Sequence, residues 1–315
     1  MIYLIAIALL AFFLEITIQR FWIDAMRKMK LEQVTKLYGP KWHEENKLGT
    51  PEMGGVVFVA VAVIVAIILC VSGFWSFTEV LLCVTYPIAA AAVGFADDLL
   101  KHLRRSSDGF TSMQKLFLQI AVTVPCVSYA AVPPYIILPY VEVSYPVYVA
   151  AVSFIGVGLL NAVNVTDGLD GLAVGCSLFS FVGALFVLCE NADAMIIAAM
   201  GCGVSLGFLW HNSHPASVFM GDVGSHFLAA LILTVCLTSG SVPAVFPLGF
   251  MFGIEIFTVF IQIVAIRHFH RKIFKMSPVH HHFELCGWKE TKIVARFWLI
   301  HIVGMLSLLL IFTLI

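Results

Sequence analysis

Long apolar segments separated by short polar ones run along the whole chain. A helix that crosses a membrane needs about 20 mostly apolar residues. Reading with a window of that length predicts about ten spans, at residues 1–20, 53–73, 77–96, 113–132, 146–163, 172–190, 194–211, 223–240, 243–266 and 294–314. We therefore expect an all-α, polytopic integral membrane protein in which residues 1–315 form a single transmembrane domain.

The composition supports this class. Of the 315 residues, 61% are hydrophobic and 12% are charged, whereas soluble domains carry about 25% charged residues. The first segment has no basic start and no small-residue cleavage site, so we read it as a retained span. The eight cysteines are scattered without a CxxC pair. We therefore expect neither a disulfide framework nor a zinc site.

The basic residues predict the orientation. All 18 Lys and Arg fall in three blocks, Arg20 to Lys47, Lys101 to Lys115 and Arg267 to Arg296. With ten spans, these loops follow spans 1, 3 and 9 and lie on one side, which the positive-inside rule assigns to the cytoplasm. An even number of spans then places both termini outside. The prolines and the alternation of residues 133–145 predict a short hairpin on that outer side.

The most informative polar stretch is NAVNVTDGLDGL, residues 161–172. Asn161, Asn164, Asp167 and Asp170 recur at every third residue, between two apolar segments. Carboxylates at the end of a membrane span are costly and usually functional. A polar loop held by its own Asx turns is the simpler alternative. We favour a polar site for phosphate and metal at the membrane surface.

Three further aspartates lie on the same predicted side. Asp97 and Asp98 are adjacent at the end of span 3, and on a helix they point about 100° apart, so we expect them to have different roles. Asp222 lies between Gly221 and Gly224 just before span 8. That position suits a metal or phosphate ligand, although Asp222 could instead be an ordinary helix N-cap.

Other polar groups on this side are weaker candidates. Lys47 could be a simple membrane anchor, a lone aromatic such as Phe219 is more often core, and three consecutive histidines cannot all ligate one metal from a regular helix. Glu255 and Gln262 share a face of span 9 and should point into the bundle or a cavity. The remaining candidates are Lys47, Asn212, Phe219, Gln262, His280, His281 and His282.

Carboxylates gathered at one surface would repel each other unless a cation neutralised them. Oxygen ligands favour Mg²⁺ or Mn²⁺ over zinc. The residues therefore predict a magnesium-dependent phosphoryl-transfer site at the cytoplasmic membrane surface, with a lipid as one substrate. A cation-coupled transporter is the alternative outside the enzyme class, but transporters place such groups near the midplane within paired repeats.

Five motifs in order, GTPEMGG, GFADDLLK, NAVNVTDGLDGLA, HPASVFMGDVGS and SPVHHHFELCGWKETKIVARFW, resemble those of the phospho-N-acetylmuramoyl-pentapeptide-transferase family. That family belongs to the polyprenyl-phosphate N-acetylhexosamine-1-phosphate transferases. The resemblance implies transfer of phospho-MurNAc-pentapeptide from UDP-MurNAc-pentapeptide to undecaprenyl phosphate, giving lipid I and UMP in peptidoglycan synthesis. A GlcNAc-1-phosphate transferase acting on the same lipid is the alternative within the superfamily.

The resemblance also implies roles, partners and a location. Asp222 would hold Mg²⁺, Asp97 and Asp98 would serve deprotonation or the metal, and His280 would join the catalytic groups. The substrate-binding residues would be Lys47, Asn164, Asp167, Asp170, Asn212, Phe219, Gln262, His281 and His282. The family implies a homodimer with a broken ninth span in the bacterial plasma membrane. It also implies inhibition by uridine nucleoside antibiotics, and no nucleic-acid partner.

Two matters stay open at this stage. The reaction could be a single displacement or could pass through a covalent intermediate. Glu52, Leu99 and His226 depart from the family's usual Thr, Tyr and Leu. None of these departures replaces a carboxylate, so they leave the expected reaction unchanged and affect only the expected shape of the cleft.

Overall fold

The computed structural model describes residues 2–29, 49–104, 106, 108–188 and 190–314. Lys47 and most of the first basic loop lie outside the described residues. The helices, whose bounds follow in chain order, are α1 (Ile2–Met29), α3 (Val56–Val71), α4 (Phe77–Arg104), α5 (Ser112–Ala130), α6 (Tyr145–Thr166), α7 (Leu172–Val187), α8 (Ala192–Asn212), α9 (Gly221–Thr238), η1 (Val242–Ala244), α10 (Val245–Leu248), α11 (Phe250–Phe269), α12 (Val279–Leu285) and α13 (Glu290–Leu314).

Each predicted span contains a helix, which confirms the all-α membrane class. Within the described residues, seven helices are long and apolar enough to cross a membrane, namely α1, α4, α6, α8, α9, α11 and α13. The apolar helices α3 and α7 are shorter. The predicted outer hairpin forms from β1 (Ile136–Leu138) and β2 (Val141–Glu142), which pair antiparallel. The cysteines that the structure describes are all free thiols, as expected.

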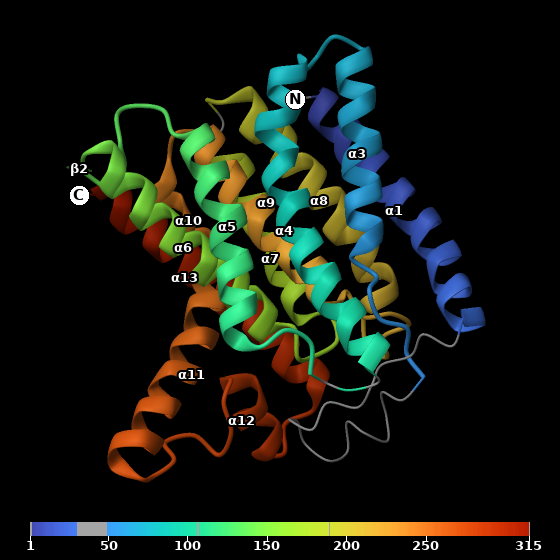
Figure 1. Cartoon of the computed structure of the whole chain (residues 1–315), viewed down its shortest axis with the longest axis vertical. Coiled ribbons are helices and arrows are strands. Elements are labelled where there is room, and N and C mark those ends of the chain that lie inside the picture. The colour runs from blue at the N-terminus through green and yellow to red at the C-terminus, as the bar shows by residue number, and fades with distance from the viewer. Residues whose placement is uncertain (1, 30–48, 105, 107, 189, 315) are drawn as a thin grey trace.

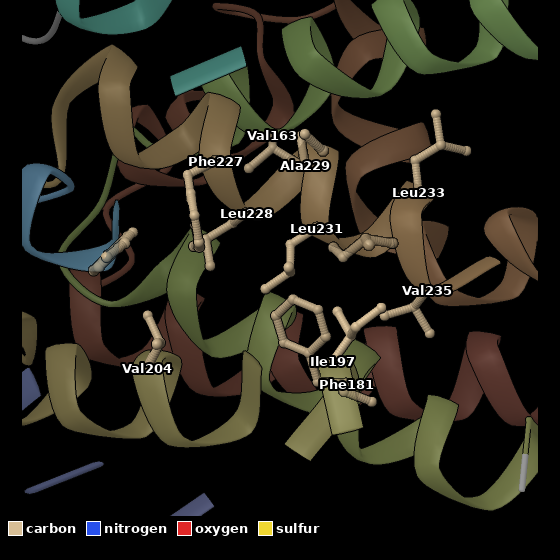
Figure 2. Packing of buried hydrophobic residues seen from close by; sticks show 14 of the residues in the cluster. Val163, Phe181, Ile197, Val204, Phe227, Leu228, Ala229, Leu231, Leu233 and Val235 are labelled. Carbon is tan, nitrogen blue, oxygen red and sulfur yellow. The ribbon is translucent and has the colours of Figure 1, made fainter. Parts of the chain in front are cut away.

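Helix α9 is the centre of the bundle (Figure 1). Its apolar window is 89% buried within the protein, compared with 28% for α1 and for α13. In Figure 2, Leu231 and Val235 of α9 lie beside Ile197 and Phe181 of neighbouring helices, within one cluster of buried residues. A helix that is apolar on all sides is stable only when surrounded, so the rest of the fold arranges itself around α9.

Glycines let the start of α9 approach its neighbours closely. A Cβ atom on Gly94 of α4 would collide with the backbone carbonyl of Asp222, and one on Gly55 would collide with the backbone of Gly224. Gly55 N also donates to Met220 O (3.0 Å). These small residues therefore bring the chain around residue 55 and helix α4 directly against the first turn of α9.

The ninth predicted span is broken. η1 and α10 together run from Val242 to Leu248, and after Gly249 helix α11 leaves the bundle in a different direction toward α12 (Figure 1). Pro247 lacks the N–H that would continue the hydrogen-bond ladder. Buried polar groups satisfy the freed backbone: Ser180 Oγ donates to Leu248 O (2.6 Å), and Met251 N donates to His301 Nδ1 (3.3 Å). Such replacement partners are what a helix break at membrane depth requires.

Candidate active site

Three buried carboxylates converge where the end of α4 meets the beginning of α9. Asp97 and Asp98 lie near the end of α4, and Asp222 lies in the first turn of α9. One oxygen from each lies within 4.8 Å of the others. Residues 125 positions apart along the chain thus form one acidic layer.

The two α4 aspartates point to different partners, as their helical spacing predicted. Asp97 Oδ1 accepts from Phe110 N (2.7 Å) in the loop before α5. Asp98 Oδ2 accepts from Val223 N (3.1 Å) in the first turn of α9. The N-cap residue of α9 is Met220, which makes no side-chain cap. Asp98 therefore caps α9 from another helix, and Asp222 is not an ordinary N-cap.

Two lysines offset part of the negative charge of this layer. Lys101 Nζ lies 2.8 Å from Asp97, 3.3 Å from Asp98 and 2.7 Å from Asp222. Lys115 Nζ lies 2.6 Å from Asp222 and 3.6 Å from Asp97. The sequence analysis used both residues only as members of a basic block that predicts orientation. The spacing of Lys101, three and four residues after the aspartates, was a usable signal, whereas only the fold brings Lys115 to Asp222.

Asn164 completes the acidic layer from α6. Its Nδ2 donates to Asp222 Oδ1 (2.6 Å) and to Ser225 Oγ (3.0 Å). Asp222 is therefore held by an amide on one oxygen and by two ammonium groups on the other. This arrangement fixes the orientation of its carboxylate.

The donor set fits a divalent cation. Three carboxylates that converge without a histidine or cysteine ligand match the preference of Mg²⁺ for oxygen. With every group ionised, three negative and two positive charges leave the layer at −1, so a divalent ion would make it +1. A negatively charged phosphate would then be attracted to the same place.

Asp170 belongs to a second cluster. Its Oδ2 accepts from His214 Nδ1 (2.9 Å) and Ala216 N (3.1 Å), while its own N–H donates to Glu290 Oε1 (2.7 Å). The regular spacing within residues 161–172 therefore does not place all four polar groups on one face. Asn161 and Asn164 lie on α6, Asp167 is its C-cap residue, and Asp170 lies in the following turn.

Asn212 is the last residue of α8, and Phe219 lies in the segment that leads into α9. Asn212 Oδ1 accepts from Gly171 N (3.0 Å), and its Nδ2 donates to Val218 O (2.8 Å). Phe219 exchanges backbone hydrogen bonds with the segment before α3, donating to Pro51 O and accepting from Gly54 N. Asn212 thus ties the loop before α7 to the loop before α9.

The three histidines of α12 diverge, as a helix requires. His280 Nδ1 lies 3.1 Å from Glu255 Oε1, and both residues are fully buried. His281 Nδ1 lies 2.6 Å from Glu284 Oε2, and His282 Nδ1 accepts from Lys275 N (3.1 Å). A Cβ on Gly168 would collide with His280 Nε2, so His280 is the member that borders the loop after α6.

Gln262 and the residues that depart from the family pattern have distinct positions. Gln262 Oε1 accepts from Ile273 N and Phe274 N, and its Nε2 donates to Phe274 O, so it holds the loop between α11 and α12. Leu99, near the end of α4, is 38% exposed. His226 is fully buried one turn after Asp222.

Comparison with known proteins agrees with this geometry. Residues 80–240 match the family described as Glycosyl transferase family 4. A phospho-N-acetylmuramoyl-pentapeptide-transferase of Caldanaerobacter subterraneus is 37% identical over 305 residues, covering 94% of this chain and 95% of the relative. Similarly named proteins of Staphylococcus carnosus (98% of each chain) and Bacillus subtilis (92% of each) are each 36% identical. The chain therefore belongs to the phospho-N-acetylmuramoyl-pentapeptide-transferase family.

Proposed function

We propose that this enzyme transfers phospho-MurNAc-pentapeptide from UDP-MurNAc-pentapeptide to undecaprenyl phosphate, producing lipid I and UMP. The observation that carries the proposal is the convergence of Asp97, Asp98 and Asp222 with two lysines at one end of the bundle. An oxygen of the lipid phosphate bonds to the sugar-linked phosphorus, and the bond from that phosphorus to the UMP oxygen breaks. Both substrates are multiply charged there, so positioning and charge neutralisation are the protein's main contributions.

Asp97, Asp98 and Asp222 hold Mg²⁺ in this proposal. The bound ion supplies charge neutralisation to the diphosphate. Asp222 is the best-fixed ligand because Asn164 and both lysines orient it. Asp97 has the second task of keeping the lipid phosphate deprotonated.

Lys101 and Lys115 change partners when substrate binds. In the present arrangement their ammonium groups contact the carboxylates. With a metal ion held by those carboxylates, one or both lysines would be free to contact phosphate oxygens within the same layer. The lysines would then balance the charge that develops on the leaving UMP.

The uridine part of the donor contacts the segments beside the acidic layer. Asn164, Asp167 and Asp170 line this side in the proposal, and Phe219 stacks on the uracil ring. His280 joins the catalytic groups in this proposal, and it borders the loop that carries Asp167. The further substrate contacts come from Lys47, Asn212, Gln262, His281 and His282.

The proposed setting is the bacterial plasma membrane, with the site on the cytoplasmic face. The start of α1 and the end of α13 lie at the end of the bundle away from α12 (Figure 1), in keeping with both termini outside. The positive-inside rule supports this orientation. We further propose that the chain acts as one domain, assembles as a homodimer, and is inhibited by uridine nucleoside antibiotics.

The test is a comparison of two donors. Purified enzyme with undecaprenyl phosphate and Mg²⁺ should form lipid-linked product and UMP from UDP-MurNAc-pentapeptide, and chelation of the metal should stop it. Product from UDP-GlcNAc alone would replace this proposal with the GlcNAc-1-phosphate transferase. Cation-driven transport without either product would support the transporter instead.

A further inference from the structure

A second layer of polar side chains lies one helical turn deeper in the bundle than the carboxylates. Its members are Gln119, Asn161 and His226, of which Gln119 and His226 are at most 1% exposed. Each lies three or four residues from a member of the upper layer on the same helix, namely Lys115 on α5, Asn164 on α6 and Asp222 on α9. Such spacing places both members on one helix face, so the two layers are parallel.

The second layer is connected by hydrogen bonds that join all three helices. His226 Nδ1 lies 2.8 Å from the backbone carbonyl oxygen of Asp222. His226 Nε2 lies 2.9 Å from Gln119 Nε2. Asn161 Nδ2 donates to Gln119 Oε1 (2.8 Å). The chain of contacts therefore runs from α9 to α5 and on to α6.

The partners determine which nitrogen of His226 carries the proton. The carbonyl of Asp222 can only accept, so Nδ1 must be the N–H. In the neutral ring Nε2 is then an acceptor, and the Gln119 amide nitrogen donates to it. That leaves Gln119 Oε1 to accept from Asn161. Gln119 Nε2 also donates to Asn161 Oδ1 (3.4 Å). Every donor in these bonds meets an acceptor, so the network fixes the orientation of the Gln119 amide.

The upper layer depends on the same three helices being in register. Lys115 from α5 and Asn164 from α6 each place one donor 2.6 Å from a different oxygen of Asp222. A small rotation of either helix would move these donors away. The connection one turn below is the nearest polar link that opposes such a rotation, because Gln119 and Asn161 share those helices.

We propose that His226 is a positioning residue, which, by bonding Gln119, sets the rotation of α5 and α6 that places Lys115 and Asn164 on Asp222. His226 touches no substrate in this role and acts in one neutral state. The expected change in kcat rests on the proposed function. The expected effect on the register of α5, α6 and α9 does not depend on that function.

Three substitutions at His226 separate this role from simple packing. In His226→Gln the amide oxygen can occupy the place of Nε2 and accept from Gln119. In His226→Asn the side chain reaches only the position of Nδ1, and His226→Leu makes neither bond. We expect kcat near wild type for the Gln variant and about tenfold lower for the Asn and Leu variants, with KM within about twofold, since small misplacements act on the transition state.

Substitution of Gln119 tests the same link from α5. Gln119→Leu should lower kcat about as much as His226→Leu, and the double variant should be no worse than either, because both break the same chain of hydrogen bonds from α9 through α5 to α6. Thr123→Val is the matched control, since Thr123 lies one turn deeper on the same face and contacts the Tyr86 hydroxyl (3.2 Å). Thr123→Val should keep the wild-type kcat, although its melting temperature should fall about as much as that of Gln119→Leu.

Amide hydrogen exchange gives a readout that needs neither metal nor turnover. Peptides covering residues 157–166 and 219–226 should exchange faster in His226→Leu and Gln119→Leu than in wild type or Thr123→Val. Unchanged exchange and kcat in both Leu variants would overturn the inference, as would a Gln variant as impaired as the Leu variant. If a His226 variant fails to fold, Gln119→Leu decides. If the wild-type enzyme is inactive with its proposed substrates, the proposed function is overturned instead. The exchange experiment then still tests the role of His226 in the register of the three helices.

Discussion

At the level of single residues, the acidic layer balances three carboxylates against two ammonium groups. Lys101 contacts all three carboxylates, and therefore occupies the position in which a shared cation is most needed. The desolvation of several charges at once is costly unless each has a partner. Changes that remove one charge should therefore affect both the site's chemistry and its dependence on metal.

We expect Asp222→Asn to lower kcat by at least about a hundredfold while the protein still folds in detergent. Asparagine keeps the shape and can still accept from Asn164, but it removes the charge that faces both lysines. Turnover of lipid-linked product is the measurement. Asp193→Asn is the matched control because Asp193 Oδ1 accepts from Trp75 Nε1 (2.8 Å) at the start of α8, a bond that asparagine can keep. Magnesium-dependent turnover at the wild-type rate in Asp222→Asn would contradict the metal role.

Lys101→Met should make the protein more dependent on divalent cation. Without the ammonium group, the carboxylates repel each other, so we expect the melting temperature in chelator to fall by about 5 °C. Added Mg²⁺ should restore more of the stability than it adds to wild type, although activity stays low. Thermal unfolding in detergent with and without Mg²⁺ measures this. An equal metal-induced shift in both proteins would argue that the ion binds elsewhere.

At the level of elements, the site depends on the end of α4 lying against the start of α9. Gly94 allows this approach because a larger residue would meet the carbonyl of Asp222. Asp98 then caps the first turn of α9 through Val223 N. The same two helices thus supply the carboxylates and fix their separation.

Gly94→Ala should therefore lower kcat about a hundredfold, since a displacement near 1 Å at the reacting groups has effects of that size. Gly158→Ala on α6 is the control, because a Cβ atom there meets nothing within 4 Å. The control should keep full activity, and its helix gains the propensity of alanine. The comparison is made by kinetics alongside thermal unfolding. Equal activity of the two variants would show that the approach of α4 to α9 does not set the site geometry.

At the level of the whole molecule, the chain forms a bundle around α9 with polar function gathered at one end. Helix α11 leaves that bundle at Gly249, and α12 places the three histidines at the same end as the acidic layer (Figure 1). The break is stabilised inside the bundle by Ser180 and His301. One buried helix break thus determines where the last polar loop lies.

Two exposed native cysteines report the orientation. Cys286 directly follows α12. Cys70 lies near the last residue of α3, at the end of that helix away from the acidic layer. A membrane-impermeant maleimide should modify Cys70 from outside intact cells and Cys286 only in inverted vesicles. Buried thiols such as Cys83 should stay unmodified and serve as internal controls. Peptide mass spectrometry identifies the modified sites, and the reverse pattern would invert the proposed topology.

Much of the fold could be predicted from hydrophobic periodicity alone, because each span must satisfy its own backbone in lipid and therefore must be helical. The helix positions, the short hairpin and the divergence of Asp97 from Asp98 followed from local spacing. The second cluster around Asp170, with His214 and Glu290, did not. Its members come from three separate segments, and no local pattern links them.

By itself, the sequence determined the membrane class, the positions of the helices and the residue types from which a metal and phosphate site could be built. These follow from properties that act within one segment, namely apolar length, helical spacing and the cost of charge in lipid. Only the tertiary structure decided that Lys115 reaches Asp222 and that His226 links α9 to α5. Those contacts depend on how helices rotate and approach one another, which is set by close packing among many residues at once.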